Sequence, residues 1–171
     1  MSESRRVAYL IGFSAPPVLH LDEFVPLPAS EGWDTHVILS PTAATWVDLQ
    51  MLARISSHPV RVQPRLPHEQ DPLPPADAVI AAPITFNSIN SWAAGMSDTL
   101  ALGILNESLG LGVNLTVAPC VKAALRLHPA YERSVRLLAS AGAILLDPDE
   151  ISTLAASGLA TMNWNLVYPR L

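Results

Sequence analysis

The middle of the chain carries an apolar run that stops at a proline and continues into a polar turn. Residues 78–82 are apolar, Pro83 ends the run, and the polar residues that follow are Thr85, Asn87 and Ser88. Because apolar residues then recur at helical spacing, this order predicts a buried strand, a turn and a helix. Side chains at such a turn can cap the helix, and free N–H groups of its first turn can hold an anionic or polar ligand. On the residues alone, capping by Asn87 or Ser88 is the simpler interpretation.

Similar apolar runs elsewhere in the chain predict further strands. They cover residues 7–11, 35–39, 113–118 and 143–146, and helices are expected at 18–30, at 43–55 and from Pro129 to Gly142. Alternating strands and helices joined by short turns predict a single-domain α/β fold. We expect a Rossmann-like (flavodoxin-like) parallel sheet with helices on both faces and its site at the carboxyl ends of the strands. Two interior prolines predict that the first helix is short or distorted.

Some segments fall outside this alternation. Residues 58–62 can form a short strand, and residues 63–76 contain too many prolines for a packed helix, so we expect an active-site loop there. The tail, residues 149–171, shows no clear period and is expected to be irregular or to form a substrate flap, for which residues 161–164 are the candidates. Residues 1–5 are expected to be a flexible N-terminus.

The composition limits the partners of the chain. Half of the residues are apolar and only 15% are charged, so we expect other subunits to cover part of the surface. A formal net charge of -5 argues against binding to nucleic acid or to an anionic membrane. Cys120 is the single cysteine; this excludes an internal disulfide and a cysteine-rich metal site, and no metal site is predicted. No apolar run reaches the length of a signal peptide or a membrane span, so a soluble cytoplasmic protein is expected.

Two blocks of the chain follow a known pattern. The first is P-x-[ST]-x-N-[ST]-[IL] followed by A-x-G-x-x-D-x-L, which this chain matches at Pro83, Thr85, Asn87, Ser88, Ile89, Ala93, Gly95, Asp98 and Leu100. The second runs from Val117 through an A-P pair to His128-Pro129-Ala130 and ends in Asp147-Pro148. In both blocks the chain resembles the flavin-containing cysteine decarboxylases, which include phosphopantothenoylcysteine decarboxylase and the lantibiotic-type peptidyl-cysteine decarboxylases. The resemblance covers roughly residues 6–148.

The resemblance implies an FMN cofactor bound between subunits of a homotrimer or of a larger assembly of trimers. Loops after successive strands would hold the cofactor, with these residues as candidates: Gly12, Phe13, Ser14, Ser40, Thr42, Pro83, Thr85, Asn87, Ser88, Asp98 and Ala118. Gly12 and Ser14 are also phosphate candidates on general grounds, since the loop after a first strand leads to a helix N-terminus. The alternatives from the residues themselves are an ordinary helix cap for Thr42 and a solvated helix face for Asp98.

The family's reaction is oxidative decarboxylation of a cysteinyl group, and the resemblance implies which residues carry it. His68 is the candidate base, because it lies in the loop that carries the family's histidine, one residue further from the strand. Asn87, Cys120, Val121 and Lys122 are the candidate substrate residues, and Lys122 is, with His68, also a candidate catalytic residue. Lys122 stands where the family has asparagine, and as a cation it can still bind a carboxylate; Arg126 replaces an aromatic residue.

The other histidines and the cysteine have simpler interpretations. We expect His128 to help cap the helix that Pro129 begins, and His20, His36 and His58 to be structural or exposed. Cys120 is expected to be a core residue rather than a nucleophile.

Three functions remain open from the sequence. The first is FMN-dependent decarboxylation of the C-terminal cysteine of a ribosomally made peptide, giving an aminoenethiol. The second is the same chemistry on phosphopantothenoylcysteine in coenzyme A biosynthesis. The third is a non-catalytic FMN-binding subunit of the same fold, an interpretation that the Lys122 substitution favours.

Overall fold

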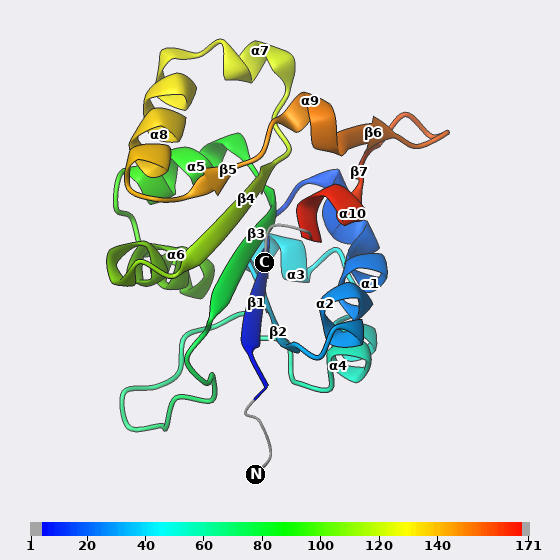
Figure 1. The fold of residues 1–171 in the computed structure, drawn as a ribbon, viewed down its shortest axis with the longest axis vertical. Helices are drawn as coiled ribbons and strands as arrows, with labels where there is room; N and C mark the ends of the chain where they lie inside the picture. Colours follow the sequence, from blue (N-terminus) through cyan, green and yellow to red (C-terminus); the bar gives the residue numbers. More distant parts are fainter. Residues whose placement is uncertain (1–4, 169–171) are drawn as a thin grey trace.

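A five-stranded parallel sheet forms the centre of the molecule. The computed structural model describes residues 5–168, and its sheet has the order β2-β1-β3-β4-β5 (Figure 1). The strands are β1 (Val7–Gly12), β2 (Asp34–Leu39), β3 (Ala78–Ile84), β4 (Asn114–Pro119) and β5 (Ile144–Leu145). Each pairs in parallel with its neighbours. The predicted α/β fold is therefore confirmed.

Helices cover both faces of the sheet, which is why its strands are apolar without alternation. On one face, Tyr9 and Ile11 of β1 join a core with α5 (Phe86–Ala93), α6 (Leu100–Leu111) and α8 (Pro129–Ser140). On the other, Leu10 joins a core that draws on these elements: η1 (Pro16–His20), α1 (Leu21–Phe24), α3 (Pro41–Ala44), α4 (Leu49–Ser56), α9 (Pro148–Ile151) and α10 (Trp164–Val167). The remaining helices are α2 (Pro26–Ser30) and α7 (Ala123–Arg126).

Several expected helices are divided. The first, predicted as distorted, is split into η1, α1 and α2, and Pro26 begins the last of these. The single helix expected at 43–55 is wrong: α3 ends at Ala44, and Asp48 starts α4 by accepting hydrogen bonds from Gln50 N and Met51 N, both at 3.0 Å. The segment after the central turn likewise forms two helices, α5 and α6. Gly95 lies in the break, with a positive φ of 75°.

The C-terminal tail is ordered, so the expectation of an irregular tail is wrong. After α9 the chain forms an antiparallel hairpin, β6 (Ser152–Leu154) and β7 (Ala160–Met162), and then α10. Met162 and Trp164 are buried in the core, and the Trp164 ring lies 5.0 Å from that of Phe24. Residues 161–164, the candidates for a substrate flap, are thus anchored to the core at these two side chains. Residues 1–4 of the expected flexible N-terminus and residues 169–171 of the tail lie outside the described residues.

Two smaller expectations concern the chain between α4 and β3. The strand expected at 58–62 is reduced to one bridge, between Arg61 and Ile38 of β2. The following proline-rich segment contains no helix or strand and lies at the amino ends of the strands (Figure 1). Among residues 5–168, no helix has the length and apolar character needed to cross a membrane.

Candidate functional site

Backbone hydrogen bonds join the loops that leave the carboxyl ends of the strands. Phe13 N donates to Pro83 O, Ser40 N donates to Gly12 O and Cys120 N donates to Ile84 O, each at 2.9 Å. The loops after β1, β2, β3 and β4 thus form one connected surface, which we call the carboxyl edge. It brings together most of the predicted cofactor and substrate residues: Gly12, Phe13, Ser14, Ser40, Thr42, Pro83, Thr85, Asn87, Ser88, Ala118, Cys120, Val121 and Lys122.

The turn between β3 and α5 is held by its own side chains. Thr85, rather than Asn87 or Ser88, is the N-cap: its Oγ1 accepts from Ser88 N at 3.1 Å and donates to Ser88 Oγ at 3.0 Å. The N–H groups of Phe86 and Asn87 belong to the unpaired first turn, and neither has a partner among the described residues. Asn87 is exposed. This turn therefore offers fixed donors to an anionic or polar ligand.

The loop after β1 offers fewer donors than a typical helix N-terminus. Pro16 and Pro17 have no N–H, and Ala15 N donates to Phe13 O at 2.8 Å. Among the donors of this described loop, the Ser14 backbone N–H and hydroxyl stay open. Gly12 has a packing role, because a Cβ there would lie 2.8 Å from a methyl carbon of Leu39.

The loop after β2 is capped by Ser40. Its Oγ accepts from Ala43 N at 3.3 Å, and Pro41 occupies the first helical position. The simpler interpretation of Thr42, an N-cap, is therefore wrong. Thr42 lies exposed in the first turn of α3.

The segment after β4 carries the substrate candidates. Cys120 is half-buried against the core, and burial raises the pKa of its thiol, in line with its interpretation as a core residue. Lys122 is exposed at the start of α7, and its carbonyl accepts from Leu125 N and Arg126 N. Arg126 makes a two-pronged ion pair with Asp149 of α9, at 3.1 and 2.9 Å. That pair raises the pKa of the guanidinium and fixes α7 against α9.

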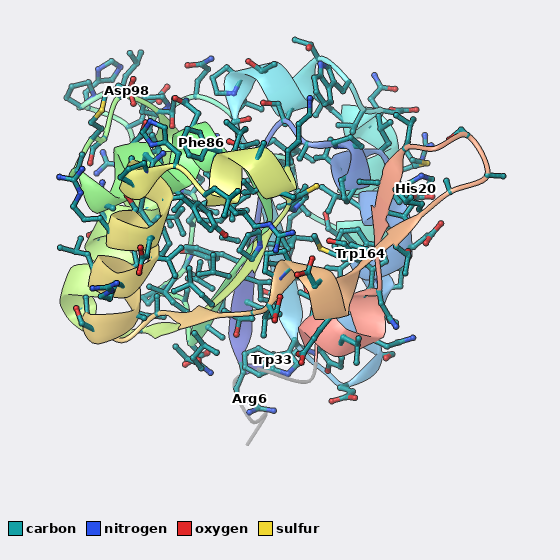
Figure 2. All side chains as sticks on the ribbon, turned by 90° about the horizontal axis from the view of Figure 1, so that it is seen from above. Arg6, His20, Trp33, Phe86, Asp98 and Trp164 are labelled. Atoms are coloured by element: carbon teal, nitrogen blue, oxygen red, sulfur yellow. The ribbon has the colours of Figure 1, made fainter. Side chains whose placement is uncertain are left out.

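Aromatic side chains wall the α8 side of the carboxyl edge. Phe86 lies edge-on to His128 at 5.7 Å and stacks with Tyr131 at 6.3 Å. His128 Nδ1 accepts from Ala130 N at 3.1 Å, so its predicted capping role is confirmed. Figure 2, which looks onto this edge, shows Phe86 on the side of α8 and Trp164 on the opposite side.

Two predicted site residues lie away from this surface. His68 is exposed in the proline-rich segment, and that segment lies at the opposite ends of the strands (Figure 1). Asp98 is exposed between α5 and α6, where it lines a hollow of about 710 Å³ together with Arg65, Pro67 and Glu107. Within one chain, therefore, the carboxyl edge is assembled without His68.

A second polar cluster, which we call the amino-edge triad, consists of Asp34, His36 and His58. His36 is buried, while His58 and Asp34 are about one-third exposed. Burial and the charge of His58 lower the pKa of His36. Burial would raise the pKa of Asp34, but the hydrogen bonds and charges of the two histidines outweigh it and lower that pKa. The sequence signal for this cluster was the Asp34-x-His36 spacing, which places two side chains on one face of a strand.

Comparison with known proteins identifies the family. The model of the Flavoprotein family matches residues 27–166. The chain belongs to the Flavoprotein family. A curated relative from an unknown prokaryotic organism, a cysteine/cysteine sulfinic acid decarboxylase, is 33% identical over 84 residues. The matched part makes up 49% of this chain and only 22% of that protein.

Solved structures share the fold of this flavoprotein over most of its length. A mutant PPC decarboxylase complexed with pantothenoylaminoethenethiol superposes with a TM-score of 0.77 at 19% identity, covering 97% of this chain and 96% of that one. The epidermin biosynthesis protein EpiD from Staphylococcus aureus gives 0.74 at 16%, covering 97% and 100%. The FMN-dependent cysteine decarboxylase TvaF of thioviridamide biosynthesis gives 0.71 at 19%, covering 86% and 93%. The resemblance drawn from the two sequence blocks is thus confirmed for family and fold.

Proposed function

We propose that this flavoprotein is an FMN-dependent decarboxylase of the C-terminal cysteine of a ribosomally made peptide, with an aminoenethiol as product. The observation that carries the proposal is the carboxyl edge, where a side-chain-fixed turn at Thr85–Ser88 presents unpaired N–H groups beside three backbone-linked loops. The epidermin biosynthesis protein EpiD, which has been solved with the substrate peptide DSYTC, and the FMN-dependent cysteine decarboxylase TvaF share this fold. Cysteine decarboxylation also appears in the name of the curated relative.

The residues of the carboxyl edge fit FMN. The Ser14 hydroxyl, the Ser40–Thr42 loop and the first turn of α5 would bind the phosphate and ribityl groups, and Pro83, Phe13 and Ala118 would line the edge behind them. When bound, the flavin supplies the two-electron oxidation of the substrate's thiol-bearing carbon, while carbon dioxide leaves. Asp98, on a different part of the chain, would contact the cofactor of a neighbouring subunit.

The chain's own residues would orient the substrate and move its proton. Lys122, exposed beside the edge, would bind the substrate carboxylate as a point charge. Asn87 would bind the substrate beside the flavin, and Cys120 and Val121 would form the wall of its pocket. His68 would act as the base.

His68 would reach the site from a second copy of the chain, because it lies at the other end of its own sheet. We therefore propose a homotrimer, or an assembly of trimers, with FMN between subunits. Exposed apolar side chains on the proline-rich segment, on the turn between α5 and α6 and on α6 support such a contact: Leu66, Met96 and Leu111 have exposed fractions of 55%, 47% and 73%. The free thiol of Cys120 fits action in the reducing cytoplasm.

Phosphopantothenoylcysteine is the second candidate substrate. The superposition with PPC decarboxylase over 97% of the chain favours it. A non-catalytic FMN-binding subunit is the third candidate, and Lys122 in place of the family's asparagine favours that one.

The absorption spectrum of the purified protein tests these candidates. We expect a flavin spectrum that bleaches when Cys-terminated peptides are added without oxygen, with release of carbon dioxide. Peptides ending in serine are the matched control, since they lack the thiol. Bleaching by phosphopantothenoylcysteine alone would select the second candidate, and a flavin that no cysteinyl compound bleaches would select the third. A protein unable to take up FMN would refute the assignment of the carboxyl edge.

A further inference from the structure

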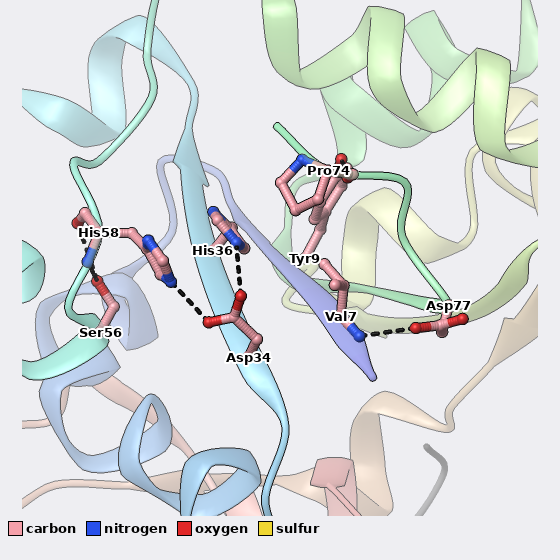
Figure 3. Close-up of polar contacts among 8 residues, drawn as sticks. All are labelled: Val7, Tyr9, Asp34, His36, Ser56, His58, Pro74 and Asp77. Atoms are coloured by element: carbon pink, nitrogen blue, oxygen red, sulfur yellow. Dashed lines mark hydrogen bonds and ion pairs between the residues drawn. The ribbon is translucent and has the colours of Figure 1, made fainter. Parts of the chain in front are cut away.

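The amino-edge triad lies at the end of the sheet opposite the proposed flavin site. Asp34 and His36 are two residues apart on β2, so their side chains share one face of the strand. His58 comes from the turn that follows α4 (Figure 3). Three side chains of metal-binding residue types thus meet from two elements that are separated in sequence.

The two imidazole rings direct the same nitrogen at one carboxylate. His58 Nε2 lies 2.6 Å from Asp34 Oδ1, and His36 Nε2 lies 3.4 Å from Asp34 Oδ2. One ligand atom from each residue lies within 4.8 Å of the other two. A Zn²⁺ ion bound by nitrogen at about 2.0–2.1 Å and by carboxylate oxygen at about 2.0–2.2 Å holds its ligand atoms within that span.

The surroundings restrict how far these side chains can move. His36 is only 5% exposed, and its ring lies between an edge contact with Tyr9 at 6.2 Å and the His58 ring, stacked at 3.9 Å. Ser57, with a φ of 62°, turns the chain after α4. Ser56 then holds the His58 backbone, since its Oγ donates to His58 O at 3.1 Å and accepts from His58 N at 3.4 Å. Rotation of the two rings about their Cβ–Cγ bonds is the adjustment that a shared ion would require.

We propose that Asp34, His36 and His58 bind a divalent transition-metal ion, of which Zn²⁺ is the representative. Two imidazoles and one carboxylate are ligands that Zn²⁺ accepts, whereas Mg²⁺ prefers oxygen ligands and keeps its waters. His58 and Asp34 are each about one-third exposed, so a water molecule can occupy the fourth position. The sequence predicted no metal site, because it does not show that His58 returns to β2.

Such an ion would act as a clamp rather than as a catalyst. It would join β2 to the turn from which the proline-rich segment starts, and so restrain that segment. Because the triad lies at the amino end of β2, the inference is independent of the proposed decarboxylase activity.

Zinc binding to the tag-free, chelator-treated FMN-loaded protein tests the proposal by isothermal titration calorimetry. We expect one Zn²⁺ per chain, a higher unfolding temperature with Zn²⁺, and no comparable effect of Mg²⁺. Asp34→Asn and His58→Gln should each weaken Zn²⁺ binding more than about tenfold, since even indirect partners of a metal contribute that much. His36 is left intact because it is buried. His20→Gln is the matched control, because His20 forms a similar, exposed imidazole–carboxylate pair with Glu23 at 3.4 Å. The Zn²⁺ affinity of this variant should equal that of the wild type.

Two results of the zinc titrations would overturn the proposal. One is the absence of Zn²⁺ binding to the wild-type protein, and the other is equal affinity in the wild type and both triad variants. The zinc X-ray absorption spectrum gives a second readout that does not depend on the variants' stability. We expect nitrogen and oxygen scatterers only, and a sulfur scatterer would place the ion at Cys120 instead.

Discussion

The two ends of the sheet are stabilised in different ways. At the carboxyl edge, main-chain bonds join the loops, as in the pairs Phe13 with Pro83 and Ser40 with Gly12. At the amino end, side chains add connections to main-chain bonds such as that from Asp77 N to Val7 O at 2.9 Å. Asp77 Oδ2 accepts from Val7 N at 2.7 Å, and the Tyr9 hydroxyl donates to Pro74 O (Figure 3).

This difference implies that side chains at the carboxyl edge are available for ligand binding, whereas side chains at the amino end contribute to stability. Main-chain bonds link the loops of the carboxyl edge to one another, and side chains such as Asn87 and Lys122 are exposed and free to meet a ligand. At the amino end, side chains such as Tyr9 and Asp77 are part of the support, so substitutions there should loosen the proline-rich segment. The following predictions test this contrast, from the largest expected effect to the smallest.

Replacement of His68 should separate catalysis from cofactor binding. His68→Asn is expected to lower decarboxylation of a Cys-terminated peptide by about 10²–10⁴-fold, as removal of a general base does, while the bound flavin spectrum and the unfolding temperature stay unchanged. Stopped-flow absorbance under anaerobic conditions measures the rate. Equal rates in variant and wild type would remove His68 from the site.

Gly12 tests the packing beneath the carboxyl edge. Gly12→Ala brings a Cβ within 2.8 Å of Leu39 and 3.1 Å of Leu21, and overpacking of this kind should lower the free energy of unfolding by about 1–3 kcal/mol. Urea denaturation measures it. Gly103→Ala is the matched control: no atom lies within 4 Å of its added Cβ in α6, so it should stabilise by about 0.5–1 kcal/mol. A loss of similar size at both positions would contradict the packing argument.

Thr85 tests the side-chain part of the carboxyl edge. Thr85→Ala removes the cap of α5 and should cost about 1 kcal/mol of unfolding free energy, together with weaker FMN binding because the first turn loosens. Thr85→Ser keeps the hydroxyl and should retain most of both quantities. Fluorescence titration of the apoprotein with FMN gives the affinity; identical values for the alanine and serine variants would show that the cap does not organise the flavin site.

Tyr9 tests the amino end through its pH dependence. Burial, followed by the nearby charges of Asp71 and Glu107, raises the pKa of Tyr9 to about 12. The unfolded chain ionises near pH 10 and the folded one near 12, so the stability contributed by the neutral phenol is present below pH 10 and is lost as the pH rises to 12.

Tyr9→Phe should remove that part of the pH dependence. It should also lower stability at pH 7 by about 0.5–1.5 kcal/mol, the usual effect of one lost hydrogen bond. Denaturant unfolding between pH 7 and 12 measures both effects in the two proteins. Parallel curves for wild type and variant would show that Tyr9 titrates normally.

The sequence by itself determined the sheet and the local chemistry of its turns. Unbroken apolar runs mark β1 and β3 as buried on both faces, and a proline after His128 marks the start of α8, because burial and capping depend on residues close together in the chain. The motif around Thr85 likewise identified the family before any contact was known.

Only the tertiary structure decided where distant segments meet. Asp48 separates α3 from α4, and the turn at Gly95 separates α5 from α6, although hydrophobic periodicity predicts one continuous helix in each place. The reason is that a capping residue can start a new helix within a few residues of the previous one. Trp164 is buried against Phe24 and His58 returns to Asp34, although nothing in either local sequence specifies the partner. Such contacts depend on the register and packing of whole elements. For the same reason, the sequence could not show that His68 and the carboxyl edge lie at opposite ends of the sheet within one chain.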